Sequence, residues 1–236
     1  MYLVAHRGLQ SKNTRENTLA AIKLGNQNPN IHAVEIDVRL TKDNNVVVIH
    51  DEDIERTSNG KGMVREMSLD RLKRFNFGTF LKRTSISTLD EVLKKFTNDT
   101  ILIIELKDEN HKNILLSTKV LNIVQNYPNL NIWFKSFSKD IILYLKENTN
   151  RPVGALVNKN HLENLLLDMD FYSISKKVIN KEMINQKNVQ NKPVMVWTIN
   201  TYNDLKLLKS TVDNYIDNIY IISDNPLIYS KLKNTL

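Results

Sequence analysis

The stretch MYLVAHRG, residues 1–8, joins a short apolar run to a pair of basic groups. Tyr2–Ala5 has the length and composition of a buried strand, and His6 and Arg7 follow it at once. The same arrangement recurs where Val46–Ile49 is followed by His50. Charges that serve only solubility would instead gather on helices. The repetition therefore indicates strands that carry functional groups at their carboxyl ends, as in barrel enzymes. Two later apolar runs end in the same way, at Glu105 and at Ser223-Asp224.

Outward from this stretch, short runs rich in Val and Ile alternate with segments of helical spacing. Such alternation predicts βαβ units and a parallel sheet, and the nearly continuous apolar character of the strands indicates that both faces are covered. About eight units can be counted, which suits a closed (β/α)₈ barrel, although an open, doubly wound sheet is the alternative. The expected strands are Tyr2–Ala5, Ala33–Leu40 with Val46–Ile49 as its extension, Ile101–Leu106, Asn131–Phe134, Val153–Val157, Phe171–Ile174, Val194–Ile199 and Ile219–Ile222. The expected helices are Leu19–Leu24, Leu89–Phe96, Ile114–Val124, Ile141–Leu145, Leu162–Leu167 and Leu205–Leu208.

One segment interrupts this rhythm. Residues 52–87 contain a turn-rich stretch and one probable helix at Ser68–Phe75, so they read as an insertion after the second strand region. No repeat or linker divides the remainder. We therefore expect residues 1–236 to form a single barrel domain that carries this insertion.

Composition narrows the class of protein. Hydrophobic residues make up 41% and charged residues 25% of the 236 residues, as in ordinary globular proteins, and cysteine is absent. The formal charge of +7 favours anionic partners, but the lysines are scattered, so nucleic-acid binding ranks last. No signal peptide is visible, and no apolar run approaches the ~20 residues that span a bilayer, so we expect a cytoplasmic protein without stable membrane insertion. The oligomeric state stays open.

A cluster of acidic residues points to a metal site. Glu35 and Asp37 are two residues apart in an expected strand, so their side chains leave the same face. Two buried carboxylates repel each other unless a cation compensates them. With Glu105 they could hold one divalent cation, and oxygen ligands without cysteine favour Mg²⁺ or Ca²⁺. The alternative is a structural ion pair of Glu35 or Glu105 with Arg7 or Lys107.

The histidines divide into two groups. His6 and His50 both stand at strand ends beside charged residues, which suggests a paired general acid and base. Asp51 could orient an imidazole or cap its loop, and the loop role is the favoured one. The three other histidines lie outside strand ends and are expected at the surface: His32, His111 and His161.

Together these groups suit a phosphate ester. Arg7 can bind phosphate oxygens with two parallel hydrogen bonds, and Lys107 supplies a point charge. One histidine would activate the nucleophile and the other would protonate the departing alkoxide.

At these residues the sequence closely resembles the glycerophosphodiester phosphodiesterase family. The family's His-Arg-Gly, Glu-Asn-Thr, Glu-x-Asp, His-Asp and Glu-x-Lys motifs occur here in that order, and weaker similarities continue to the last strand. The motifs are His6-Arg7-Gly8, Glu16-Asn17-Thr18, Glu35-Ile36-Asp37, His50-Asp51 and Glu105-Leu106-Lys107. The later ones are Ser87–Leu93, Ser136-Phe137, Val196–Asn200 and Ser223–Pro226. The ordered set is highly specific, whereas any one motif is weak.

The resemblance implies a TIM barrel that hydrolyses glycerophosphodiesters to an alcohol and sn-glycerol 3-phosphate with a divalent metal. By position it implies His6 and His50 as the acid–base pair. The ligand set that it implies is Glu35, Asp37 and Glu105, with Arg7 and Lys107 on the phosphate. It further implies that Phe137 and Trp197 line the pocket beside the glycerol moiety, the alternative for both being core packing, and that Glu16 and Asn17 brace the first loop.

Three other functions are alternatives. A related barrel could cleave larger lipids as a lysophospholipase D or a phospholipase C, but the insertion is mostly charged, which favours small water-soluble substrates. A non-catalytic phosphate-binding barrel would have lost a histidine or a carboxylate, and this chain keeps all of them. Nucleic-acid binding rests on net charge alone. The preferred alcohol, the choice between Mg²⁺ and Ca²⁺, and the nucleophile, water or a substrate hydroxyl, stay open.

Overall fold

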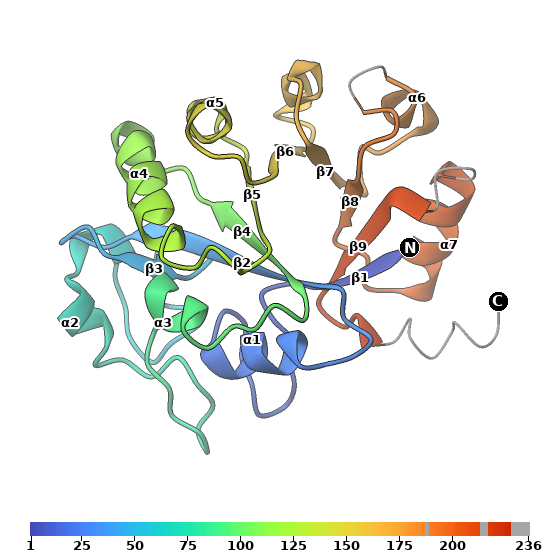
Figure 1. Ribbon diagram of the computed structural model, residues 1–236. Coiled ribbons are helices and arrows are strands. Elements are labelled where there is room, and N and C mark those ends of the chain that lie inside the picture. Colours follow the sequence, from blue (N-terminus) through green and yellow to red (C-terminus); the bar gives the residue numbers. More distant parts are fainter. Residues whose placement is uncertain (187–188, 213–216, 228–236) are drawn as a thin grey trace.

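A computed structural model describes residues 1–186, 189–212 and 217–227 of the chain. Strands alternate with helices along its whole length (Figure 1). The strands are β1 (Tyr2–Ala5), β2 (Ala33–Leu40), β3 (Val46–Val48), β4 (Ile101–Leu106), β5 (Ile132–Ser136), β6 (Val153–Val157), β7 (Phe171–Ser175), β8 (Val194–Trp197) and β9 (Ile219–Ser223). The α-helices are α1 (Leu19–Asn26), α2 (Leu69–Leu72), α3 (Leu89–Leu93), α4 (Asn113–Val124), α5 (Lys139–Asn148), α6 (Lys181–Ile184) and α7 (Tyr202–Val212). The described residues also include the 3₁₀ turns η1 (Val64–Glu66), η2 (Asn110–Lys112) and η3 (Leu162–Leu166).

The strands form a closed barrel. Parallel pairing runs from β1 through β9, β8, β7, β6, β5 and β4 to β2, and β2 pairs back with β1. The pairing of Val4 with both Ala33 and Ile222 closes the ring. Strand β3 lies outside this ring as an antiparallel extension on the far part of β2. The predicted (β/α)₈ barrel is therefore confirmed, and the open doubly wound sheet is excluded.

The two faces of the strands bury different side chains. On β2, Val34, Ile36 and Val38 point outward and join the large core beneath the helices, which surround the barrel (Figure 1). Their neighbours Ala33, Glu35 and Asp37 alternate with them and point into the barrel. Because both faces are covered, the strand is almost wholly buried, as the apolar runs predicted.

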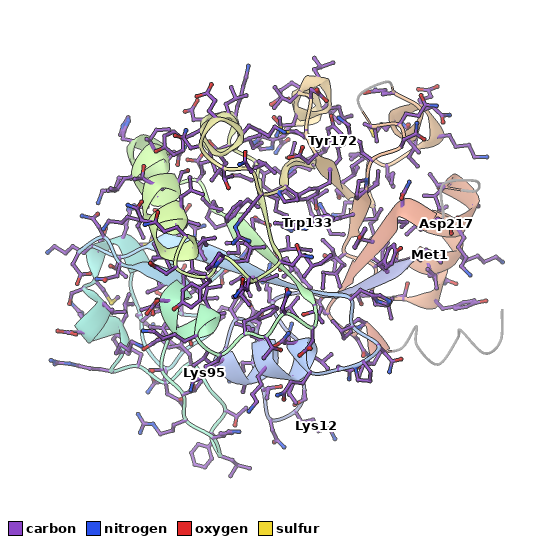
Figure 2. All side chains as sticks on the ribbon, viewed as in Figure 1. Met1, Lys12, Lys95, Trp133, Tyr172 and Asp217 are labelled. Carbon is purple, nitrogen blue, oxygen red and sulfur yellow. The ribbon has the colours of Figure 1, made fainter. Side chains whose placement is uncertain are left out.

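Inside the barrel, aromatic rings fill the level below the charged groups. The ring centroid of Trp133 lies 5.1 Å from that of Phe171 and 5.8 Å from that of Tyr220. Figure 2 labels Trp133 within the ring of strands and Tyr172, the neighbour of Phe171, which belongs to the outer core. Gly154 of β6 makes room for Phe171, because a Cβ at this position would lie 2.3 Å from its ring.

Several helices start where the sequence provides caps. Thr18 accepts a hydrogen bond from the Ala21 amide at the start of α1, and Thr88 and Glu91 form a capping box on α3. Some predicted bounds were wrong. The helices expected at Ser68–Phe75 and Leu89–Phe96 are shorter, and the helix expected at Leu162–Leu167 is the 3₁₀ turn Leu162–Leu166. Strand β5 was predicted to end at Phe134 but continues, since Lys135 pairs with Glu105 of β4.

The insertion, residues 52–87, has a small core of its own. Ile54, Val64, Leu72 and Phe77 pack with Val47 of β3 in a cluster separate from the main core. This cluster holds the insertion beside β2 and β3, where Figure 1 shows it in teal. Among the described residues no helix is long and apolar enough to cross a membrane.

Candidate active site

Three carboxylates meet inside the carboxyl-terminal end of the barrel. Glu35 and Asp37 come from β2 and Glu105 from β4, and the register places Asp37 directly opposite Glu105. One oxygen of each group lies within 4.8 Å of one oxygen of each of the others. All three side chains are buried. The structure thus brings together the residues that were predicted as metal ligands.

Three basic groups balance these acids. Lys107 Nζ lies 2.8 Å from Asp37 Oδ1 and also contacts Glu105. Lys135 Nζ lies 3.0 Å from Glu35 Oε1 and 3.2 Å from Glu105 Oε2. Arg7 Nε lies 3.4 Å from Asp37 Oδ2. The ion pairs that the alternative interpretation expected are therefore present. Three positive charges face three negative ones.

The charges shift one another's ionisation strongly. Burial opposes ionisation of Asp37, but the charges of Lys107, His50 and Arg7 outweigh it and hold the pKa of this carboxyl far below its usual range. Burial likewise opposes the charge on Lys107, yet Asp37 and Glu105 raise the pKa of its ammonium. Asp37 and Lys107 are consequently both charged near neutral pH.

The donor set fits a hard divalent cation. Glu35 Oε1 and Asp37 Oδ1 are fully buried and accept no hydrogen bond of good geometry from any described residue, although each lies close to an ammonium. Buried carboxylate oxygens of this kind are available as ligands, and oxygen-only sets favour Mg²⁺ or Ca²⁺.

Each of the two strand-end histidines is held by its own carboxylate. His6 Nδ1 lies 2.6 Å from Asp224 Oδ1, and His50 Nδ1 lies 2.7 Å from Asp51 Oδ1. Since a carboxylate accepts, the Nδ1 atoms carry the proton in these pairs, and the other ring nitrogen is left for chemistry. Asp51 combines the two roles that were considered for it, because it holds the imidazole of His50 and also accepts hydrogen bonds from Arg56 of the loop that follows.

A chain of ion pairs connects the insertion to the first loop. Arg56 binds Asp51 through Nε at 2.6 Å and Glu16 through Nη2 at 2.7 Å, and Glu16 also accepts from Arg7 Nη1 at 2.9 Å. Burial would raise the pKa of Asp51, but hydrogen bonds from Arg56 and His50 lower it to about 2. Asp51 is therefore a carboxylate throughout the neutral range.

The first loop turns sharply beneath these contacts. Gly8 has φ +85° and packs so closely on α1 that a Cβ would lie 2.7 Å from the Ala21 backbone. Asn17 donates to Asp37 Oδ2 at 2.9 Å and accepts from the Asp37 amide at 3.2 Å. These contacts agree with the prediction that Asn17 braces the loop, and they fix Asp37 as well.

A cavity of about 130 Å³ opens above the charged groups. Phe137 and Trp197 line it, with their ring centroids 5.9 Å apart in an edge-to-face contact. The remaining lining residues are His6, Arg7, His50, Glu105, Lys107, Lys135, Leu156 and Thr198. The structure thus places seven of the nine predicted site residues directly on one cavity, with Glu35 and Asp37 buried beneath it.

The comparison with known families identifies this arrangement. A family model described as the glycerophosphoryl diester phosphodiesterase family matches residues 6–218. The chain belongs to this family. The resemblance found in the sequence motifs is therefore confirmed. Membership of this family places the protein among the phosphoric diester hydrolases.

Individual relatives extend over nearly the whole chain of this family member. The Bacillus subtilis protein YhdW is 31% identical over 244 residues, which cover 95% of this chain and 98% of YhdW. A glycerophosphodiester phosphodiesterase of Caldanaerobacter subterraneus is 29% identical and covers 95% of this chain and 94% of its own length. A solved Oleispira antarctica phosphodiesterase in complex with the product sn-glycerol-3-phosphate has a TM-score of 0.85 at 25% identity, with 99% of this chain and 97% of the other covered.

The sequence interpretation missed three residues that either line the cavity or contact a side chain that lines it. Lys135 was overlooked because it stands at the end of an apolar run, although it shares the inward face with Trp133. Asp224 was noted at a strand end without a partner. His161 was expected at the surface, yet its ring centroid lies 4.8 Å from that of Phe137. His32 also departs from that expectation, since its Nδ1 accepts from the Leu3 amide at 3.0 Å.

Proposed function

We propose that this chain hydrolyses glycerophosphodiesters to an alcohol and sn-glycerol 3-phosphate. The observation that carries the proposal is the pair of imidazoles, each hydrogen-bonded through Nδ1 to a separate carboxylate, which face one cavity above three buried acids. The names of the relatives support it, as does the sn-glycerol-3-phosphate bound to the Oleispira antarctica enzyme.

We assign proton transfer to His6 and His50. Asp224 and Asp51 fix the Nδ1 proton of each ring, so the second nitrogen can accept or donate at the reacting oxygens. One imidazole takes the proton of the attacking hydroxyl, and the other gives a proton to the alkoxide that leaves phosphorus. Trapping of a cyclic phosphate would identify a substrate hydroxyl as the attacking group, and its absence would favour water.

We assign binding of the phosphate to Arg7 and Lys107. Both side chains line the cavity from opposite sides of Asp37, which they contact through Nε and Nζ respectively. Their charges suit the oxygens of a diester, which gain negative charge as the new bond forms. For the glycerol moiety we propose Phe137 and Trp197, whose rings form the apolar wall of the cavity.

Glu35, Asp37 and Glu105 would hold one divalent cation, Mg²⁺ or Ca²⁺. When bound, such a cation supplies a Lewis acid that polarises phosphoryl oxygens. The chain's own contribution is to orient the three carboxylates and to balance their charge, through Lys107, Lys135 and the amide of Asn17.

Two further proposals concern the whole chain. Residues 1–236 would act as one barrel domain with residues 52–87 as an insertion, because the small core of the insertion packs on β3. The partner would be a small water-soluble diester rather than nucleic acid. A cytoplasmic location stays a prediction.

The direct test is to incubate the purified chain with glycerophosphocholine and to measure sn-glycerol 3-phosphate. We expect product with Mg²⁺ or Ca²⁺ and loss of product in EDTA. His50→Ala should lower turnover by ~10²–10⁴-fold. His111→Ala is the matched control, since His111 is exposed in η2 and lies outside the cavity. A chain that releases no product from glycerophosphocholine, -ethanolamine or -glycerol would refute the proposal.

A further inference from the structure

Two apolar side chains stand almost fully exposed at the tip of the insertion. Phe80 is 96% exposed and Leu81 is 88% exposed, and they are adjacent in the chain. Single exposed apolar residues are normal on protein surfaces, and Leu166 and Leu207 are examples here. Two neighbouring apolar residues that are both almost fully exposed require a different explanation, because neither gains the stabilisation that burial on folding would provide.

The tip is a built loop rather than a loose end. The Phe77 amide donates to the Thr84 carbonyl at 2.7 Å and closes the loop. Inside it, Asn76 Oδ1 accepts from the amides of Gly78 and Thr84, both at 3.0 Å, and Asn76 Nδ2 donates to the Thr79 carbonyl. Gly78 is held so tightly that a Cβ would lie 2.1 Å from the Lys82 carbonyl oxygen. The fold itself therefore presents Phe80 and Leu81 outward.

The charge of the tip adds a second signal. Lys82 and Arg83 follow the apolar pair directly, both are exposed, and neither forms an ion pair with a described residue. From Arg71 to Arg83 the sequence contains five basic residues and no acidic one. An apolar tip beside unpaired cations complements a surface that is anionic outside and apolar just beneath, which is the interface of an anionic lipid bilayer.

We propose that residues 76–84 form an interfacial anchor that binds anionic membranes. Phe80 and Leu81 enter the boundary between headgroups and acyl chains, while Lys82 and Arg83 stay at the level of the lipid phosphates. The internal hydrogen bonds of Asn76 suit this location, since backbone groups that enter a bilayer need partners within the protein. The binding is peripheral and reversible, and it does not depend on the reaction proposed above.

The anchor is connected to the candidate active site. Phe77 within the anchor and Ile86 just after it line a small cavity together with His50. The loop therefore packs close to the segment that carries His50.

The proposal is tested by flotation of the full chain with vesicles. Vesicles of phosphatidylglycerol and phosphatidylcholine in equal parts are compared with vesicles of phosphatidylcholine alone. We expect binding to the anionic vesicles that weakens with salt. The double variant Phe80→Ser/Leu81→Ser should bind about 10- to 100-fold more weakly, and Lys82→Gln/Arg83→Gln about 10- to 30-fold more weakly. The matched control Leu166→Ser/Leu207→Ser should bind like the wild type.

A second readout distinguishes insertion from simple charge attraction. In Phe80→Trp, the added indole should be quenched by brominated lipids, measured against the wild-type background of Trp133 and Trp197. Absence of wild-type binding, or equal binding by Phe80→Ser/Leu81→Ser, overturns the proposal. A wild-type dimer in sedimentation that becomes monomeric in Phe80→Ser/Leu81→Ser also overturns it, since the tip would then contact a second copy of the chain.

Discussion

Lys135→Met tests how the buried charges of the barrel are balanced. Lys135 is 2% exposed, and its ammonium contacts both Glu35 and Glu105. Methionine keeps much of the length of lysine, so the substitution removes the charge without leaving a large cavity. Glu105 retains its contact with Lys107, whereas Glu35 loses its ammonium partner while it stays completely buried.

The structure sets the size of the expected effect. Removing one partner of a buried ion pair costs about 3–5 kcal/mol, because the remaining charge has no compensation. We therefore expect the free energy of unfolding in EDTA to fall by about 3–5 kcal/mol. For a chain of this length the melting temperature should fall by roughly 6–20 °C. Urea denaturation followed by far-ultraviolet circular dichroism measures the free energy, and calorimetry measures the melting temperature.

Two further variants make this result decisive. Lys146→Met removes an ammonium 2.8 Å from Asp170, but both of those side chains are more than a third exposed, so the loss should stay below about 1 kcal/mol. Adding Glu35→Gln to Lys135→Met should recover most of the loss, since the uncompensated charge is then gone. A divalent cation should stabilise Lys135→Met more than the wild type. If Lys135→Met costs no more than Lys146→Met, the reasoning is refuted.

Three other variants or conditions test separate parts of the structure. Asp224→Asn removes the negative charge that lies 2.6 Å from His6 Nδ1, so kcat should fall by ~10²–10⁴-fold with little change in KM. An unchanged kcat in steady-state assays would contradict the role of Asp224. Gly154→Ala places a methyl group 2.3 Å from the Phe171 ring and should lower the free energy of unfolding by about 1–3 kcal/mol. Adding Phe171→Leu should restore part of the lost stability, and denaturation curves would measure both changes. Hydrogen bonds from Arg56 and His50 outweigh burial and lower the pKa of Asp51 to about 2, against 3.8 ordinarily, so the unfolded chain binds the proton first as acid is added. Stability should therefore fall between pH 4 and 2, and Asp51→Asn should show a smaller fall in urea midpoint over that range than the wild type; equal pH profiles would disprove this linkage.

The barrel could be predicted from sequence because its signal is local. On strand β2, Val34, Ile36 and Val38 alternate with Ala33, Glu35 and Asp37, so the apolar outer face can be recognised from the sequence alone. The helix bounds were less accurate, since tertiary packing rather than intrinsic preference decides where α2 and α3 end.

The site was predictable only in part, because some contacts exist only after the ring closes. Glu35 and Asp37 reveal their common face by spacing, but nothing local shows that Lys135 will lie between Glu35 and Glu105. That contact depends on the register of β4 with β5. Likewise Asp224 reaches His6 only because β9 pairs with β1, 218 positions apart in the sequence.

The rings of Trp133, Phe171 and Tyr220 fill the barrel below the charged groups, so the cavity opens only at the carboxyl-terminal end of the strands. A molecule that enters this cavity must leave through the same opening. Substrate and product therefore share one opening. Accumulation of the phosphorylated product should slow the binding of further substrate without a separate inhibitory site.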